Sequence, residues 1–205
     1  MPTVTVAGID GQKGSVMDWI DTPHPQGDAR VVKSDVKRLA ELAVMDYVIG
    51  NYDRHGQNFM VDNAGVIQPI DHGLSFPEGN KGSHTIGGHN IPVFVAALAG
   101  KSTRTAVYQH TGRSIEKPEE LRRNSIGHND LVFDRVRDMM PVLKADKLPE
   151  WADDMAKRHG LSPDSAKTIV ARARDVVAAF DKHEAAKDSD AMFTELWKKG
   201  WKHVP

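Results

Sequence analysis

The sequence contains no cysteine, little net charge and no long apolar run, and each absence excludes a class of protein. With no cysteine among 205 residues, disulfides, thiol catalysis and thiolate zinc sites are excluded. The 27 basic and 28 acidic residues give a formal net charge of −1, whereas nucleic-acid-binding proteins usually carry a net basic surface. The longest apolar run, at 93–99, is far shorter than the roughly 20 residues that span a bilayer. We therefore predict no nucleic-acid partner and no membrane span.

The composition is that of a folded domain or one large lobe with extensions. Hydrophobic residues make up 40% of the chain and charged residues 27%, which is enough for a packed core. Residues 1–10 lack the basic and apolar regions of a signal peptide, and the absence of cysteine fits a reducing compartment. We therefore expect a cytoplasmic protein.

The first half of the sequence predicts two short strands, a helix and a hairpin. Weak alternation over 3–9 and the run at 15–20 predict strands on either side of an Asp-Gly turn at 10–11. Apolar residues at helical spacing predict a helix over 35–50, which Gly50-Asn51 ends. After a polar loop at 52–57, short apolar runs at 58–61 and 66–70 flank an Asn/Gly turn and predict a β-hairpin.

The second half is predicted to be helical after a glycine-rich loop at 74–90. Helices are expected over 91–99, 131–143, 150–159, 163–184 and 193–201, the fourth capped by Ser162 with Pro163 at its first position. Trp197 and Trp201 lie four residues apart, so we expect them on one helical face against the core. The fold class predicted is α+β and mostly α, with one small hairpin at its active edge.

Three oxygen-bearing side chains carry the chemical signal. Asp53 and Asn58 are five residues apart, and Asp71 follows Asn58 after thirteen. The loop presents Asp53 at its start and Asn58 at its end, and the hairpin returns the chain so that Asp71 arrives beside Asn58. Carboxylate and amide oxygens of this kind, together with phosphate oxygens, are the usual ligands of Mg²⁺.

These residues resemble those of a known family. Asp-Arg-His-x-x-Asn at 53–58 followed by Ile-Asp-x-Gly at 70–73 is similar to the catalytic and metal-binding loops of phosphatidylinositol 3- and 4-kinase-like enzymes. Both spacings also agree with the corresponding loops of protein kinases. The resemblance is clear over residues 35–76 and looser over 15–76. It implies a kinase-like fold that binds ATP and Mg²⁺.

The resemblance implies a role for each residue of the two loops. Asp53 would orient or deprotonate the acceptor hydroxyl, and His55 would lie near the transferred phosphoryl group. Arg54, the third candidate of the catalytic loop, would brace that loop. Asn58 and Asp71 would hold the Mg²⁺ ions that bridge the nucleotide phosphates.

The resemblance also implies a division of the chain. Residues 1–30 would form a short N-terminal β and hinge segment, and residues 31–205 a protein-kinase-like helical C-lobe. Met17 and Trp19 would belong to the hinge that lines the adenine pocket, with Asp71 also on the cofactor. The C-lobe would contain a catalytic loop at 52–58, a metal loop at 70–73 and an activation-type loop at 74–90.

The sequence departs from a complete kinase in its N-terminal part. No Gly-x-Gly-x-x-Gly is present, and about thirty residues precede the first helix, whereas the kinase N-lobe needs a glycine-rich loop and a strand lysine. Lys13 reads as a turn lysine. The N-lobe is therefore truncated, missing or supplied by another chain. His72 follows Asp71, where protein kinases have phenylalanine.

Three functions remain open from sequence. The first is ATP- and Mg²⁺-dependent phosphotransfer to a hydroxyl of a protein or small molecule, by a phosphatidylinositol 3-/4-kinase-related enzyme. The second is a kinase-derived binding or structural protein without its own N-lobe, and the third is nucleotidyl transfer on the same residues. Ten histidines are present, but no His-x₃-His or His-Glu-x-x-His spacing occurs, so the signal for a zinc site is weak.

Overall fold

The computed structural model describes residues 4–9, 12–17, 36–51, 54, 58–62, 66–72, 75, 93–99 and 129–201. Its elements are β1 (Val4–Ile9), β2 (Gln12–Met17), α1 (Val36–Ile49), β3 (Phe59–Val61), β4 (Ile67–Pro69), α2 (Val93–Leu98), α5 (Asn129–Leu143), α6 (Leu148–Arg158), α7 (Pro163–His183) and α8 (Ser189–Trp201). The protein is mostly helical with small two-stranded antiparallel sheets, so the predicted α+β class is confirmed.

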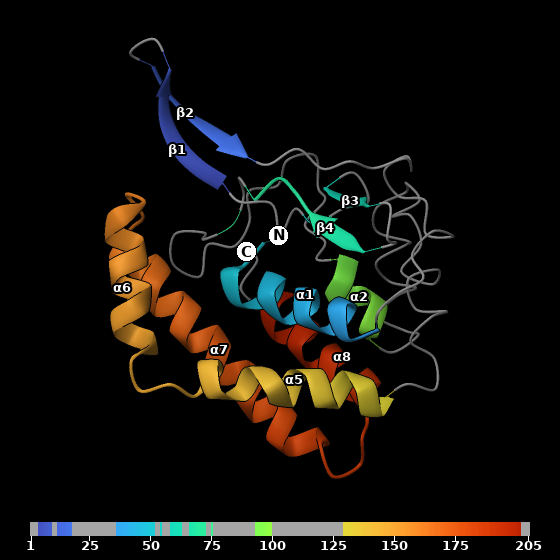
Figure 1. The fold of residues 1–205 in the computed structure, drawn as a ribbon. Helices are drawn as coiled ribbons and strands as arrows, with labels where there is room; N and C mark the ends of the chain where they lie inside the picture. Colours follow the sequence, from blue (N-terminus) through green and yellow to red (C-terminus); the bar gives the residue numbers. More distant parts are fainter. Residues whose placement is uncertain are drawn as a thin grey trace.

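Helix α1 lies at the centre of the helical body. It packs against α2, α5 and α7, and α8 packs against α2 and α7 (Figure 1). The apolar stripe read from the sequence faces this core, because Leu39, Ala40 and Ala43 of α1 are fully buried. Aromatic pairs fill the remaining space: the rings of Phe133 and Phe180 have centroids 5.6 Å apart. Burial of this apolar stripe fixes the orientation of α1 against the neighbouring helices.

The C-terminal end of α1 is closed by a glycine. Gly50 has φ of +65°, and its N–H donates to the carbonyl of Tyr47 at 3.2 Å while Asn51 N–H donates to the carbonyl of Asp46 at 2.9 Å. These two bonds form a Schellman motif, which satisfies carbonyls that a helix end leaves without partners. The chain therefore leaves α1 in a fixed direction at Asn51.

The hairpin β3–β4 sits above α1 in Figure 1. Phe59 pairs with Pro69, and Val61 with Ile67, as the sequence predicted for two runs around an Asn/Gly turn. Asp62 closes the turn, because its carboxylate accepts from the N–H of Val66 at 3.0 Å. From below, Arg38 of α1 donates to the carbonyl of Ile67 at 3.4 Å, which ties the hairpin to the helix.

The first hairpin, β1–β2, confirms one strand and corrects the other. The strand expected at 3–9 is β1, but the strand expected at 15–20 lies at Gln12–Met17. The register explains the shift: Ile9 pairs directly with Gln12, so the second strand begins straight after a two-residue connection. Val4 pairs with Met17 at the other end. The connection itself and residues 18–20 lie outside the described residues.

The predicted helices are confirmed wherever the structure describes them. The helices expected over 35–50, 91–99, 131–143, 150–159 and 163–184 correspond to α1, α2, α5, α6 and α7, and the last helix begins earlier than expected, at Ser189. Trp197 is buried as predicted, whereas the side chain of Trp201 lies outside the description. No helix in the described part of the chain is both long and apolar enough to cross a membrane. The loop predicted at 74–90 is described only at Ser75.

The turn between α6 and α7 uses local signals that were visible in the sequence. Gly160 has φ of +65°, and the N–H of Leu161 donates to the carbonyl of Ala156 at 2.8 Å. The hydroxyl of Ser162 then accepts from the N–H of Ser165 at 3.3 Å, which caps α7 as predicted. A Cβ built on Gly160 would meet nothing within 4 Å, so only backbone strain opposes a side chain there.

We expect Gly160→Ala to lower the free energy of unfolding by about 1 kcal/mol, because alanine is strained at positive φ. Gly160→Asn should lose less, since asparagine tolerates this conformation better. Urea denaturation of the two variants measures the difference. Equal stability of the alanine variant and the wild type would contradict the assignment of this turn.

Candidate functional site

The loop after α1 and the hairpin β3–β4 meet at the mouth of the hairpin. Asn58 precedes β3, and Ile70 follows β4, where its N–H donates to the carbonyl of Asn58 at 3.0 Å. Asp71 is the next residue. The chain return expected from the sequence therefore places the backbone of Asp71 beside that of Asn58, although the two lie thirteen residues apart.

Asn58 and Asp71 occupy contrasting environments at this mouth. Asn58 is 5% exposed, whereas Asp71 is exposed. Asp71 also has φ of +52°, a left-handed conformation that aspartate adopts more readily than most residues. The hairpin therefore ends in an abrupt turn that leaves a carboxylate at the surface beside a buried amide residue.

Arg54 is the buried cation that joins these parts. It is completely buried, and its Nη1 donates to the carbonyls of both Asn58 and Ile70. Its Nε and Nη2 donate to the carboxylate of Asp46 at 2.9 Å and 3.2 Å, and Nη2 also lies 3.3 Å from Nδ1 of His72. Five contacts match the five N–H donors of a guanidinium. Arg54 thus connects helix, loop and both hairpin ends.

Asp46 is the buried counter-charge for Arg54. It lies in the last turns of α1 and is 3% exposed, and Asn51 donates to its Oδ1 at 3.4 Å. Burial raises the pKa of the Asp46 carboxyl above its usual 3.8, against the opposing charge and hydrogen bonds of Arg54 and the amide of Asn51. Each partner of this pair depends on the other, because an unpaired charge is costly in a protein interior.

Helix α2 supports the guanidinium from its other face. The Arg54 carbon Cζ lies 5.7 Å from the centroid of the Phe94 ring, within the range of a cation–π contact. The Phe94 ring in turn lies 5.3 Å from that of Phe59 in β3. The short helix predicted at 91–99 therefore packs directly beneath the candidate site.

His72 completes the contacts around Arg54. Burial and the charge of Arg54 lower the pKa of His72 below its usual 6.5, against the carboxylate of Asp71 and the carbonyl of Pro69, which raise it. A guanidinium has only donors, so Nδ1 of His72 accepts from it. A neutral imidazole can accept in this way, whereas a protonated one cannot.

The structure places some of the residues predicted from sequence and leaves others outside its description. Arg54, Asn58 and Asp71 are brought together at the hairpin mouth. Asp53, His55 and Trp19 lie outside the described residues, and Met17 is described only as the last residue of β2. The roles expected for these four residues stay predictions.

The donor set at the hairpin mouth fits a magnesium ion in its chemistry. An amide oxygen from Asn58 and a carboxylate from Asp71 are hard oxygen ligands, and Mg²⁺ is commonly held by one or two carboxylates with substrate phosphates. In the part of the chain that the structure describes, no three His, Cys, Asp or Glu side chains cluster to hold a metal. A site here would therefore need the nucleotide phosphates or residues beyond that part, such as Asp53.

Sequence reasoning missed Asp46 and Asn51. Asp46 falls three residues after Ala43 and seven after Leu39, so it lies on the apolar stripe of α1. An acidic residue at a position that the helical period assigns to the core needs a buried partner. This signal, together with the arginine of the following loop, indicates the Asp46–Arg54 pair without any coordinates.

Comparison with known proteins agrees with this site. Residues 17–95 match the family model described as Phosphatidylinositol 3- and 4-kinase, a range that includes α1, the loop, the hairpin and the first half of α2. This part of the chain is therefore similar to the phosphatidylinositol 3- and 4-kinase family, which agrees with the resemblance read from the sequence. Searches of curated proteins and of solved structures found no match.

We expect Arg54→Met to lower the free energy of unfolding by about 3–5 kcal/mol, because it leaves the Asp46 carboxylate buried without a counter-charge. The exposed pair Asp154–Arg158, at 2.7 Å, supplies a control: Arg158→Met should change stability by less than ~1 kcal/mol. Chemical denaturation measures both.

The double variant D46N/R54M tests the same pair by a double-mutant cycle. It should lose clearly less stability than the two single variants added together, since Asp46→Asn removes the charge that Arg54→Met strands. Strict additivity would show that the two side chains do not interact.

We expect the free energy of unfolding to fall as the pH drops through about 6.5, because unfolded His72 takes up a proton that the folded imidazole binds less well. The contribution of one such group is at most about 1.4 kcal/mol per pH unit. His72→Asn should flatten the curve between pH 7.5 and 5.5, measured by urea denaturation with EDTA present. Parallel curves for variant and wild type would contradict a lowered pKa.

Proposed function

We propose that this protein is an ATP- and Mg²⁺-dependent phosphotransferase related to the phosphatidylinositol 3- and 4-kinases, acting on a hydroxyl of a protein or small molecule. The observation that carries the proposal is the Arg54 contact to the carbonyls of both Asn58 and Ile70. It joins the end of the catalytic segment to the residue before Asp71. The family match over residues 17–95 supports the kinase-like class.

Asn58 and Asp71 are the residues we assign to the metal. Bound there, the Mg²⁺–nucleotide would supply neutralisation of phosphate charge, which is the main requirement of phosphoryl transfer. Asn58 contributes an amide oxygen from the buried side of the hairpin mouth, and Asp71 a carboxylate from the exposed side. The hydrogen bond from the N–H of Ile70 to the carbonyl of Asn58 keeps the two backbones side by side, which favours a preorganised site for the phosphates.

Asp53, His55 and Arg54 complete the assignment. Asp53 orients the acceptor hydroxyl and accepts its proton, and His55 lies near the transferred phosphoryl group. Arg54 has every donor engaged within the protein, so it serves as a positioning residue and does not contact the phosphates.

The remaining parts of the proposal concern the rest of the chain. We assign residues 31–205 to a kinase-like C-lobe and residues 1–30 to an N-terminal β and hinge segment, with Met17 and Trp19 at the adenine. The loop at 74–90 is the proposed activation-type loop. A cytoplasmic location remains a prediction from composition.

A second candidate is a kinase-derived binding or structural protein. The observation that favours it is the small amount of sheet before α1: the residues described there form two strands, β1 and β2, whereas a kinase N-lobe grips the phosphates with a glycine-rich loop and a strand lysine. Another chain that supplies this lobe would restore the first candidate. Nucleotidyl transfer on the same residues is distinguished by the mass added to the acceptor.

We expect ATP with Mg²⁺ to raise the melting temperature, and ATP with EDTA to raise it much less, because the assigned ligands act through the metal. Asp71→Asn should remove most of the metal-dependent shift. Asp53→Asn should keep the shift and abolish product formation, followed by mass spectrometry of the acceptor. Asp153→Asn, a change at an exposed residue of α6, serves as the control.

A shift that is equal with and without Mg²⁺, or unchanged in the Asp71 variant, would contradict the metal assignment. A metal-dependent shift with no turnover on any acceptor tested would favour the binding or structural protein. Turnover that survives Asp53→Asn would show that another group accepts the proton.

A further inference from the structure

The last turn of α1 is held on two sides. On one side, the carboxylate of Asp46 accepts hydrogen bonds from Arg54, which belongs to the loop at 52–58. The next residue, Tyr47, points toward α7, because its hydroxyl donates to Oδ2 of Asp175 at 3.1 Å. Any movement of this turn relative to α7 would therefore be passed on to Asn51 and Arg54.

Arg172 of α7 also contacts this turn directly. Its Nη1 donates to the carbonyl of Tyr47 at 3.2 Å, and its Cζ lies 5.9 Å from the centroid of the Tyr47 ring. The carbonyl of Tyr47 is one of the terminal acceptors of α1, where a cation is favoured by the helix dipole. Arg172 thus contacts both the backbone carbonyl and the ring of Tyr47.

The burial of Arg172 makes this contact specific. Arg172 is 4% exposed, and burial lowers the pKa of its guanidinium to about 10, against the electrostatic influence of Tyr47 and Asp175, which raises it. It remains charged at neutral pH. A buried charge is costly unless its environment compensates it. The carbonyl and the ring of Tyr47 supply part of that compensation, and they hold the guanidinium of Arg172 at the end of α1.

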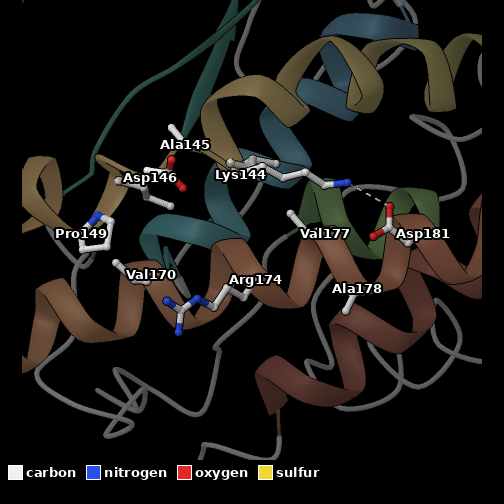
Figure 2. A pocket seen from close by; sticks show the side chains of 11 residues that line it. Lys144, Ala145, Asp146, Pro149, Val170, Arg174, Val177, Ala178 and Asp181 are labelled. Carbon is white, nitrogen blue, oxygen red and sulfur yellow. Dashed lines mark hydrogen bonds and ion pairs between the residues drawn. The ribbon is translucent and has the colours of Figure 1, made fainter.

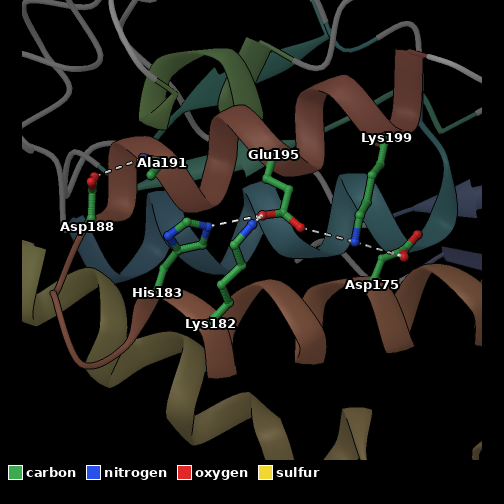
Figure 3. Close-up of polar contacts among 7 residues, drawn as sticks. All are labelled: Asp175, Lys182, His183, Asp188, Ala191, Glu195 and Lys199. Atoms are coloured by element: carbon green, nitrogen blue, oxygen red, sulfur yellow. Dashed lines mark hydrogen bonds and ion pairs between the residues drawn. The ribbon is translucent and has the colours of Figure 1, made fainter.

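A chain of ion pairs joins α7, from Asp175 onward, to α8. Asp175 binds Lys199 at 3.3 Å, and Lys199 binds Glu195 at 3.3 Å; Figure 3 shows this chain between the two helices. Glu195 also accepts from Lys182 at 2.8 Å, and its pKa is lowered to about 2, first by Lys182. These ion pairs hold α7 against α8 from Asp175 to Lys182.

We propose that Arg172 is a positioning residue of the candidate active site, which holds from α7 the turn of α1 that carries the catalytic segment. The proposal rests on the proposed function for its kinetic consequence. Its structural consequence, that the segment from 47 to 60 loosens without Arg172, is independent of any activity.

The experiment compares Arg172→Met with Arg174→Met on the same helix. Arg174 is exposed and makes no hydrogen bond or ion pair within the described part of the chain. It lines a groove of about 450 Å³ between α7 and the turn after α5, as Figure 2 shows. Arg172→Lys keeps the charge and one donor. Each variant is measured for kcat and KM with ATP–Mg²⁺, well below its melting temperature, and for hydrogen exchange without nucleotide.

We expect Arg172→Met to lower kcat by about 10- to 100-fold with a smaller change in KM, since displacements near 1 Å have effects of this size. Exchange should become faster in residues 47–60 and stay unchanged in α5. Arg172→Lys should recover part of both effects, and Arg174→Met should match the wild type. If Arg172→Met does not fold, Arg172→Lys carries the same comparison with smaller effects.

Two results would overturn the proposal. One is wild-type exchange over 47–60 in the Arg172 variants, and the other is faster exchange in all elements alike with unchanged kcat for the folded protein, which would show a role in global stability alone. If the wild type itself has no turnover, the proposed function fails, and the exchange data alone decide on Arg172.

Discussion

The candidate site depends on one buried ion pair. Arg54 is enclosed by protein, and its five donors reach a helix, the start of a hairpin and its end. Such a group is tolerated inside a protein only when every donor is matched, because the loss of one partner exposes the full cost of desolvation. The pair with Asp46 therefore couples the end of α1 to the geometry of the hairpin. Positions of Asn58 and Asp71 follow from that coupling.

The same turn of α1 also explains why a long helical region accompanies so small a site. Asp46 bonds Arg54 of the loop, and the next residue, Tyr47, bonds Asp175 of α7. These two consecutive residues therefore connect the hairpin to the helical body. Gly50 completes the arrangement, since its positive φ directs the chain out of the helix. Accurate placement of a few oxygen ligands is what phosphoryl transfer requires of a protein, and packing between helices is a rigid means to provide it.

Much of this fold follows from local signals in the sequence. Three features could be predicted because each depends on residues close in sequence. They are the helical period of α1, the turn between β3 and β4, and the Ser162 cap. The start of β2 was misplaced because pairing with β1, which fixes its register, leaves a weak pattern in Gln12–Met17. Arg172 could not be assigned from sequence, since its partner lies 125 residues away. The motif at 53–58 and 70–73 identified Asn58 and Asp71, but the contact that joins their backbones needed the structure.

The most direct test of the central claim is paramagnetic NMR with Mn²⁺ in place of Mg²⁺. We expect Mn²⁺, added with ATP, to broaden the signals of Asn58 and Asp71 strongly and to leave those of the groove at Arg174 sharp. Broadening that is centred elsewhere, or that is the same with and without ATP, would contradict a metal–nucleotide site at the mouth of the hairpin.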